Sequence, residues 1–154
     1  MKIAAWNVNS LKVRLPHLLD WLSEQQPDAL CIQETKLEDH NFPLSALEDA
    51  GYHAVFAGQK TYNGVALLSR HPIEEVSTGI PGFEDPQKRV IAGTIGGLRV
   101  ISVYIPNGQE VGSEKYAYKL DWLKALEAWL ESELRRYPQL ALCGDYNIAP
   151  EDRD

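Results

Sequence analysis

The order of short apolar runs and long amphipathic stretches constrains the fold of this chain more than any other feature. Leucines recur at helical spacing from Leu11 to Leu22, and a second apolar stripe predicts a helix from about Glu114 to Arg136, with Ser113 as its cap. Gly96-Gly97 separates two β-rich runs and suits a tight antiparallel turn. Strands are predicted at 3–8, 29–33, 53–57, 65–69, 90–95, 98–105 and 140–143, and a short helix at 44–49.

This pattern predicts an α+β fold, with helices on one face of a mixed, largely antiparallel sheet. The 154 residues are 44% apolar, enough for one compact domain spanning 1–154. No run approaches the ~20 apolar residues that a membrane span needs, and the chain opens without an export signal. A cytoplasmic protein that does not bind membranes is expected. Cys31 and Cys143 each lie in an apolar run and are expected to be buried free thiols.

The formal net charge of −7 argues against a protein that binds nucleic acid through bulk electrostatics. The argument is weak for a metalloenzyme. Carboxylates that bind a cation add to the negative count, whereas the cation itself is left out of it.

Polar side chains follow several apolar strands at the point where each is predicted to end. They are Asn7, Glu34, Asn107, and Asp145 with Asn147. Strand ends are where open sheets commonly present functional groups. Carboxylate oxygens suit a hard cation such as Mg²⁺, which needs only one or two of them from the protein.

The residue types alone leave other interpretations open. A carboxylate after a strand is more often an exposed loop residue or a helix cap, and Asn7 suits a turn equally well. Tyr104 can hydrogen-bond a phosphoryl oxygen, but by spacing alone an ordinary strand aromatic is favoured.

Five motifs, in order and spread over almost the whole chain, resemble the signatures of the exonuclease III and abasic-site endonuclease family. This family is a branch of the endonuclease/exonuclease/phosphatase superfamily. The motifs are WNVNS at 6–10, QETK at 33–36, GVALLSR at 64–70, YIPNG at 104–108 and GDYNIAP at 144–150.

The resemblance implies a four-layered α/β sandwich like that of deoxyribonuclease I. It also implies a Mg²⁺-dependent DNA phosphodiesterase of base-excision repair, with Mn²⁺ as a substitute ion. Such an enzyme acts as a 3′–5′ exonuclease and abasic-site endonuclease on double-stranded DNA.

Matched residue by residue, the resemblance makes Glu34 the principal metal ligand, with Asn7 supporting the metal or orienting Asp145. Asp145 and Asn147 complete the metal set. Asp145 would be the general acid or base, Asn147 would stabilise the transition state, and Tyr104 would contact the scissile phosphate.

Other polar residues follow from the same match. Asn107 and Lys36 would lie close to the site, and Arg89, Lys115 and Lys119 would contact DNA phosphates. For Lys115 and Lys119, spaced i,i+4 on the second long helix, a solvated helix face is an equally good interpretation.

The family pattern continues with motifs that this sequence does not contain, among them a Ser-Asp-His. The expectation is therefore a truncated domain without its second sheet, which would leave an apolar sheet face exposed and promote self-association. Part of the Mg²⁺ site would remain, with little nuclease activity.

Two other functions stay open. One is a superfamily phosphatase or phosphodiesterase acting on a small or lipid substrate, and the other is a non-catalytic remnant that binds DNA or a protein partner. The QETK and YIPNG motifs favour the nuclease branch.

Overall fold

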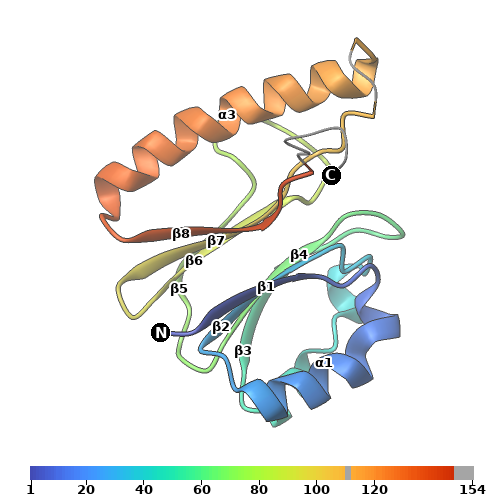
Figure 1. The fold of residues 1–154 in the computed structure, drawn as a ribbon, viewed down its shortest axis with the longest axis vertical. Coiled ribbons are helices and arrows are strands. Elements are labelled where there is room, and N and C mark those ends of the chain that lie inside the picture. The colour runs from blue at the N-terminus through green and yellow to red at the C-terminus, as the bar shows by residue number, and fades with distance from the viewer. Residues whose placement is uncertain (110–111, 148–154) are drawn as a thin grey trace, which may run out of the picture.

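A computed structural model describes residues 1–109 and 112–147, which form four layers: helix, sheet, sheet, helix (Figure 1). One outer layer holds α1 and α2, and the other holds α3. The elements are β1 (Ile3–Asn7), α1 (Leu11–Gln25), β2 (Ala29–Gln33), the 3₁₀ turn η1 (Asp39–Asn41), α2 (Leu44–Asp49), β3 (His53–Ala57), β4 (Val65–Ser69), β5 (Glu74–Thr78), β6 (Val90–Ile95), β7 (Leu98–Tyr104), α3 (Glu114–Arg136) and β8 (Leu140–Asp145).

Each sheet has four strands, in the orders β1-β2-β4-β3 and β5-β6-β7-β8. The pairs β1–β2 and β7–β8 are parallel, and all other pairs are antiparallel. Each parallel pair is joined by a helical crossover, through α1 and α3 respectively, as parallel neighbours require. The helices therefore follow from the topology and cover the outer faces of the two sheets.

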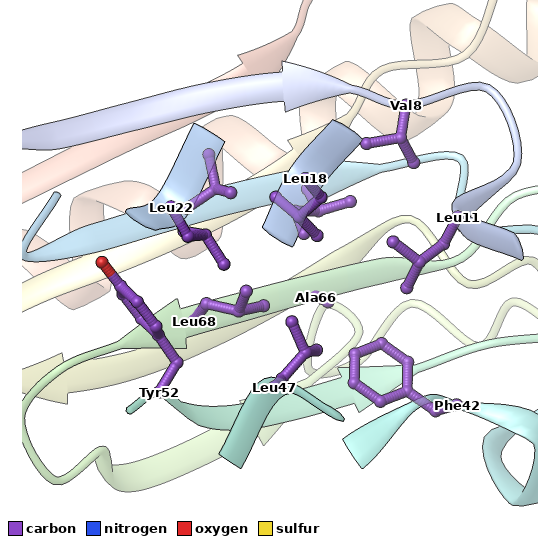
Figure 2. Close-up of a cluster of buried hydrophobic side chains, with 11 residues drawn as sticks. Val8, Leu11, Leu18, Leu22, Phe42, Leu47, Tyr52, Ala66 and Leu68 are labelled. Atoms are coloured by element: carbon purple, nitrogen blue, oxygen red, sulfur yellow. The ribbon is translucent and has the colours of Figure 1, made fainter. Parts of the chain in front are cut away.

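The first sheet packs against α1 and α2 through one cluster of buried apolar side chains. Leu11, Leu18 and Leu22 project from α1 onto the sheet, as the leucine spacing predicts (Figure 2). Leu47 from α2 meets them, and the ring of Phe42 stacks on Phe56 at a centroid distance of 3.9 Å. Each fully buried leucine stabilises the fold by about 1.5–3 kcal/mol.

Helix α3 packs on the second sheet through residues spaced by three or four. Trp122, Leu126 and Trp129 are buried there. Ser113 caps the first turn, because its side chain accepts a hydrogen bond from the Tyr116 amide at 3.1 Å. The cap and the end of this helix lie where the sequence predicts them. The predicted apolar stripe is wrong in part: Leu126 is buried, but Leu120 and Leu134 are 42% and 52% exposed, because the two tryptophans turn the packed face of the helix away from them.

The two sheets pack face to face through a third apolar cluster, which includes Cys31, Leu67 and Ile91, each 0% exposed. The α+β class and the four-layered sandwich are confirmed. The predicted absence of the second sheet is wrong, because β5 to β8 form that sheet within this chain. The inner face of the first sheet is covered, so the predicted reason for self-association is removed.

Smaller differences from the sequence prediction concern strand ends. The first strand and β7 each stop one residue early, β8 extends to Asp145, and β5 was not predicted as a separate strand. Cys31 and Cys143 are both free thiols, the second only partly buried. Among the described residues, none of the helices combines the length and apolar character of a membrane-spanning segment.

Candidate active site

The carboxyl ends of two parallel strand pairs meet at one end of the sandwich. Asn7 ends β1 beside Gln33 at the end of β2, and Tyr104 ends β7 beside Asp145 at the end of β8. Because the two sheets pack against each other, polar residues from four strands come together.

The amide of Asn7 joins the two carboxylates predicted as metal ligands. Its Nδ2 donates to Glu34 Oε2 at 2.7 Å and to Asp145 Oδ2 at 2.9 Å. Its Oδ1 accepts from the Asn9 backbone amide at 3.0 Å, which fixes the orientation of the side chain. A neutral amide therefore holds two carboxylates together without neutralising either charge.

Glu34 lies just beyond β2 in a strained backbone conformation. Its φ of +55° is in the left-handed region, which costs a non-glycine residue about 1–3 kcal/mol. The next two residues are held by backbone hydrogen bonds, Thr35 N to Gly64 O at 3.2 Å and Lys36 N to Asn63 O at 2.9 Å. Gly64 permits this approach, since a Cβ there would lie 2.0 Å from Thr35 Oγ1. Such strain is typical of functional sites.

Asp145 and Asn147 form a compact turn after β8. The Asn147 amide nitrogen donates to Asp145 Oδ1 at 3.0 Å, and Asn147 Nδ2 donates to Ile105 O at 2.7 Å. Lys119 Nζ donates to Asn147 O at 2.7 Å, so this lysine braces the turn from α3. The Lys119 side chain is therefore more than part of a solvated helix face.

Tyr104 borders Glu34 and lies under Arg89. Burial raises the pKa of the Tyr104 phenol above its usual value, and the charge of Glu34 and a hydrogen bond to it raise it further. The phenol is therefore neutral and able to donate at physiological pH. The Arg89 guanidinium carbon is 4.8 Å from the Tyr104 ring centroid, within the range of a cation–π contact.

Two hollows flank these carboxylates. A cavity of about 410 Å³ brings together five predicted site residues, and a second of about 380 Å³ holds three more, while Lys119 lines neither. The hydrogen bond from Asn7 to Glu34 crosses from one to the other. The first is lined in part by Glu34, Arg89, Tyr104, Asn107 and Lys115, and the second in part by Asn7, Asp145 and Asn147.

Lys36 lies beside Glu34. Its Nζ donates to Asn9 Oδ1 at 2.6 Å and is 3.9 Å from Glu34 Oε1. The contact with the carboxylate is long and about 30% of the lysine side chain is exposed, so it offsets the charge of Glu34 only weakly.

The sequence prediction missed six polar residues that line the larger hollow. Gln87, Gln109 and Tyr118 lie within four residues of predicted site residues in the sequence, and that proximity is the only signal that could have indicated them. The other three follow β3 in a loop that carries no recognised motif. The missed residues are Gln59, Tyr62, Asn63, Gln87, Gln109 and Tyr118.

The donor chemistry suits a hard divalent cation. Two carboxylates each lie within hydrogen-bonding distance of one amide, and no group of three or more His, Cys, Asp and Glu in residues 1–109 and 112–147 is arranged to hold a metal. Mg²⁺ fits such a set, because water and substrate phosphate complete its coordination. A four-ligand zinc site would need more.

The description "Endonuclease/Exonuclease/phosphatase family" belongs to a family model that matches residues 4–154. The chain belongs to this family. The resemblance to exonuclease III seen in the motifs is confirmed by relatives of that name.

The family members most similar to this chain include enzymes and solved structures. Exodeoxyribonuclease III of Haemophilus influenzae is 37% identical, over 100% of this chain and 60% of the relative. A 3′ phosphatase from Neisseria, solved with a product DNA hairpin, is 49% identical with a TM-score of 0.97, over 100% of this chain and 60% of that one. An AP endonuclease from Archaeoglobus fulgidus is 43% identical with a TM-score of 0.93 and the same coverage.

The chain thus spans about three fifths of the length of these family members. The last motif, at 144–150, is described only through Asn147, and residues 148–150 lie outside the described residues.

Proposed function

We propose that this chain carries the amino-terminal catalytic residues of a metal-dependent DNA phosphodiesterase similar to exonuclease III. One observation carries the proposal. The Asn7 amide joins Glu34 and Asp145, two carboxylates from different sheets, at 2.7 and 2.9 Å. A structural role would leave no reason to hold two like charges so close, whereas a site for a divalent cation requires it.

Mg²⁺ is the proposed ion, and Mn²⁺ has the same preference for hard oxygen ligands. Glu34 would be its principal ligand, with Asp145, Asn7 and Asn147 as the remaining candidates. When bound, such an ion polarises a phosphoryl oxygen and stabilises the charge that develops on it.

Proton transfer and the contacts to phosphate are assigned to three side chains. Asp145 is the proposed proton-transfer group, oriented by Asn7 Nδ2 and by the Asn147 backbone amide. Tyr104 stays neutral because its pKa is raised, and would donate its phenolic hydrogen to a phosphate oxygen. One N–H of Asn147 Nδ2 bonds Ile105 O, leaving the amide's second N–H for a phosphoryl oxygen.

Phosphate binding would come from local cations, because the chain as a whole is acidic, with a net charge of −7. Arg89 and Lys115 line the hollow that holds Glu34, and the exposed Asn107 lies with them. Lys119 would act by bracing Asn147 and not by direct contact alone. We expect DNA to follow this side of the molecule only.

The proposed substrates are 3′ ends and abasic sites of double-stranded DNA. Support comes from the names of relatives, which include a 3′ phosphatase, an exodeoxyribonuclease and an AP endonuclease. Hydrolysis of a terminal phosphate and of a phosphodiester need the same positioned charges around phosphorus. A cytoplasmic location remains part of the proposal.

Mg²⁺ titration tests the site directly. Calorimetry of the purified chain should show Mg²⁺ binding that Glu34→Gln abolishes and Asp145→Asn weakens, since each substitution removes one ligand charge at nearly constant shape. The rise in melting temperature on addition of Mg²⁺ should be largest for the wild type, smaller for Asp145→Asn and absent for Glu34→Gln. The reason is that an ion that binds only the folded state raises the stability of that state.

Glu131→Gln is the matched control. This exposed carboxylate lies on α3, so its loss changes the net charge equally and should leave Mg²⁺ binding intact. Equal binding by the wild type and Glu34→Gln would refute the proposed site. In parallel, a labelled duplex with one abasic site and another with a 3′-phosphate should be bound more tightly with Mg²⁺ than with EDTA, with little cleavage.

A further inference from the structure

Arg89 is held by an unusual number of partners for a side chain that borders an open hollow. Its Nε donates to Gln87 Oε1 at 2.8 Å, and its Nη1 donates to Tyr104 O at 3.1 Å. Its guanidinium carbon lies 4.8 Å from the Tyr104 ring centroid and 6.0 Å from that of Tyr118. These contacts fix the direction of the Arg89 side chain.

Asp85 contacts two of these partners. Its Oδ2 accepts a short hydrogen bond from the Tyr118 phenol, and its Oδ1 accepts from the Gln87 backbone amide at 2.9 Å. Tyr118 in turn lies beside the Arg89 guanidinium, whose carbon is 6.0 Å from the Tyr118 ring centroid. One chain of contacts therefore runs from Arg89 to Tyr118 to Asp85, and a second, made of hydrogen bonds, runs from Arg89 through Gln87 to the same carboxylate.

Tyr118 can connect Arg89 to Asp85 in the first chain because its phenol keeps its proton. Burial raises the pKa of its phenol well above the usual value, and the hydrogen bond to Asp85 raises it further. The phenol therefore keeps its proton at physiological pH and donates it to the Asp85 carboxylate.

Asp85 does not border the hollow itself, whereas Arg89, Gln87, Tyr104 and Tyr118 do. Its carboxylate thus acts on the hollow only through them. We propose that Asp85 is a positioning residue for the phosphate-binding Arg89, which it orients through Tyr118 and the Gln87 backbone. This inference rests on the proposed function, because it takes phosphate binding as the task of Arg89.

The proposal makes a prediction whose sign opposes bulk electrostatics. Removing a negative charge from an acidic protein should strengthen DNA binding or leave it unchanged. Asp85→Ala should instead weaken binding of a fluorescein-labelled duplex with a 3′-phosphate, by about tenfold, which corresponds to one charge-assisted hydrogen bond. Tyr118→Phe should weaken binding in the same direction and by less.

Glu84→Ala is the matched control, because Glu84 is the exposed carboxylate directly before Asp85. Its loss should leave affinity unchanged or slightly raise it. Asp85→Ala combined with Arg89→Ala should bind no more weakly than Arg89→Ala alone, since a positioning residue has nothing left to position. Asp85→Asn, which keeps one acceptor oxygen, should recover part of the lost affinity and serves if the alanine variant does not fold.

A spectroscopic readout separates this inference from the proposed function. In the wild type, the Nε–H cross peak of Arg89, assigned by its loss in Arg89→Lys, should be well dispersed and slow to exchange. In Asp85→Ala it should move to the position of a free arginine. An unmoved cross peak, or tighter DNA binding by Asp85→Ala, would overturn the proposal. A moved cross peak with DNA affinity unaffected by Arg89→Ala would support the positioning role and refute phosphate binding by Arg89.

Discussion

Carboxylates gather at both ends of the second sheet, in two clusters of opposite character. Arg99 and Tyr104 lie on the same strand, β7, about 17 Å apart at the usual rise per residue. Around Arg99, the buried guanidinium forms an ion pair with the buried carboxylate of Glu133. At the Tyr104 end, Glu34 and Asp145 meet only the neutral amide of Asn7.

The Arg99 cluster is chemically complete. Arg99 and Glu133 are 3% and 4% exposed, and the guanidinium lies 4.6 Å from the Tyr137 ring centroid. A guanidinium has five N–H groups, and each has an acceptor here. The acceptors are Glu133 Oε1 for two of them, and Glu75 O, Thr94 Oγ1 and Ser77 Oγ for the others.

The Asn7 cluster is chemically incomplete by the same measure. Both carboxylates are only partly buried, and the nearest lysine nitrogen, that of Lys36, is 3.9 Å from Glu34. A neutralised cluster contributes to stability or specificity, whereas an excess of negative charge in a hollow is suited to a cation. Charge balance alone therefore distinguishes the Arg99 cluster, a structural site, from the Asn7 cluster, the proposed functional site.

Glu133→Gln should give the largest effect on stability. It leaves the buried Arg99 without its counter-charge, and breaking a buried ion pair costs about 3–5 kcal/mol. The free energy of unfolding from urea titration measures this cost. Glu131→Gln on the exposed face of α3 is the control and should lie within about 0.5 kcal/mol of the wild type. A loss below about 1 kcal/mol for Glu133→Gln would show that the buried Arg99 does not depend on Glu133 as its counter-charge.

Asn7→Asp should give the next largest effect, about 2 kcal/mol of destabilisation in EDTA. It removes two hydrogen bonds to carboxylates and places a third negative charge between them. Added Mg²⁺ should recover much of the loss, because a cation neutralises the cluster. Urea titration with and without Mg²⁺ checks both parts. Equal destabilisation in the two conditions would mean that Asn7 is a structural residue only.

Glu34→Gln should have the smallest effect, and the opposite sign. Without metal it should stabilise the fold by up to about 1 kcal/mol at low ionic strength, because it relieves repulsion from Asp145. Added NaCl should shrink the gain by screening. Thermal unfolding in EDTA at low and high salt measures it. A clear loss of stability would place Glu34 with Glu133, among the residues kept for the fold.

Local patterns in the sequence predict the elements well, because helix and strand periodicity depend on neighbours along the chain. The leucine spacing of α1 and the cap of α3 are cases in which the structure follows the pattern, whereas only part of the leucine stripe predicted for α3 is buried. The division of strands between sheets is different. Periodicity marks a strand without naming its partner, so β5 to β8 were not predicted to form a sheet of their own.

The same limit applies to the site. Asn7, Glu34 and Asp145 were found through motifs, although 138 residues separate the first from the last. Asp85 and Tyr118 carry no motif, and only folding brings them together across 33 residues. The pairing of Arg99 with Glu133 was likewise hidden, because neither residue type predicts burial without knowledge of its partner.

Among the described residues, β1 and β8 each lie at the edge of their sheet, and each pairs with only one neighbour. Asn7 and Asp145 end these two strands, so on one side of each strand no other strand of the described chain protects the backbone from exchange with solvent deuterium. A further strand that paired with either edge would reduce this exchange and at the same time restrict the motion of a catalytic side chain. Occupancy of these edges therefore sets how rigidly Asn7 and Asp145 are held.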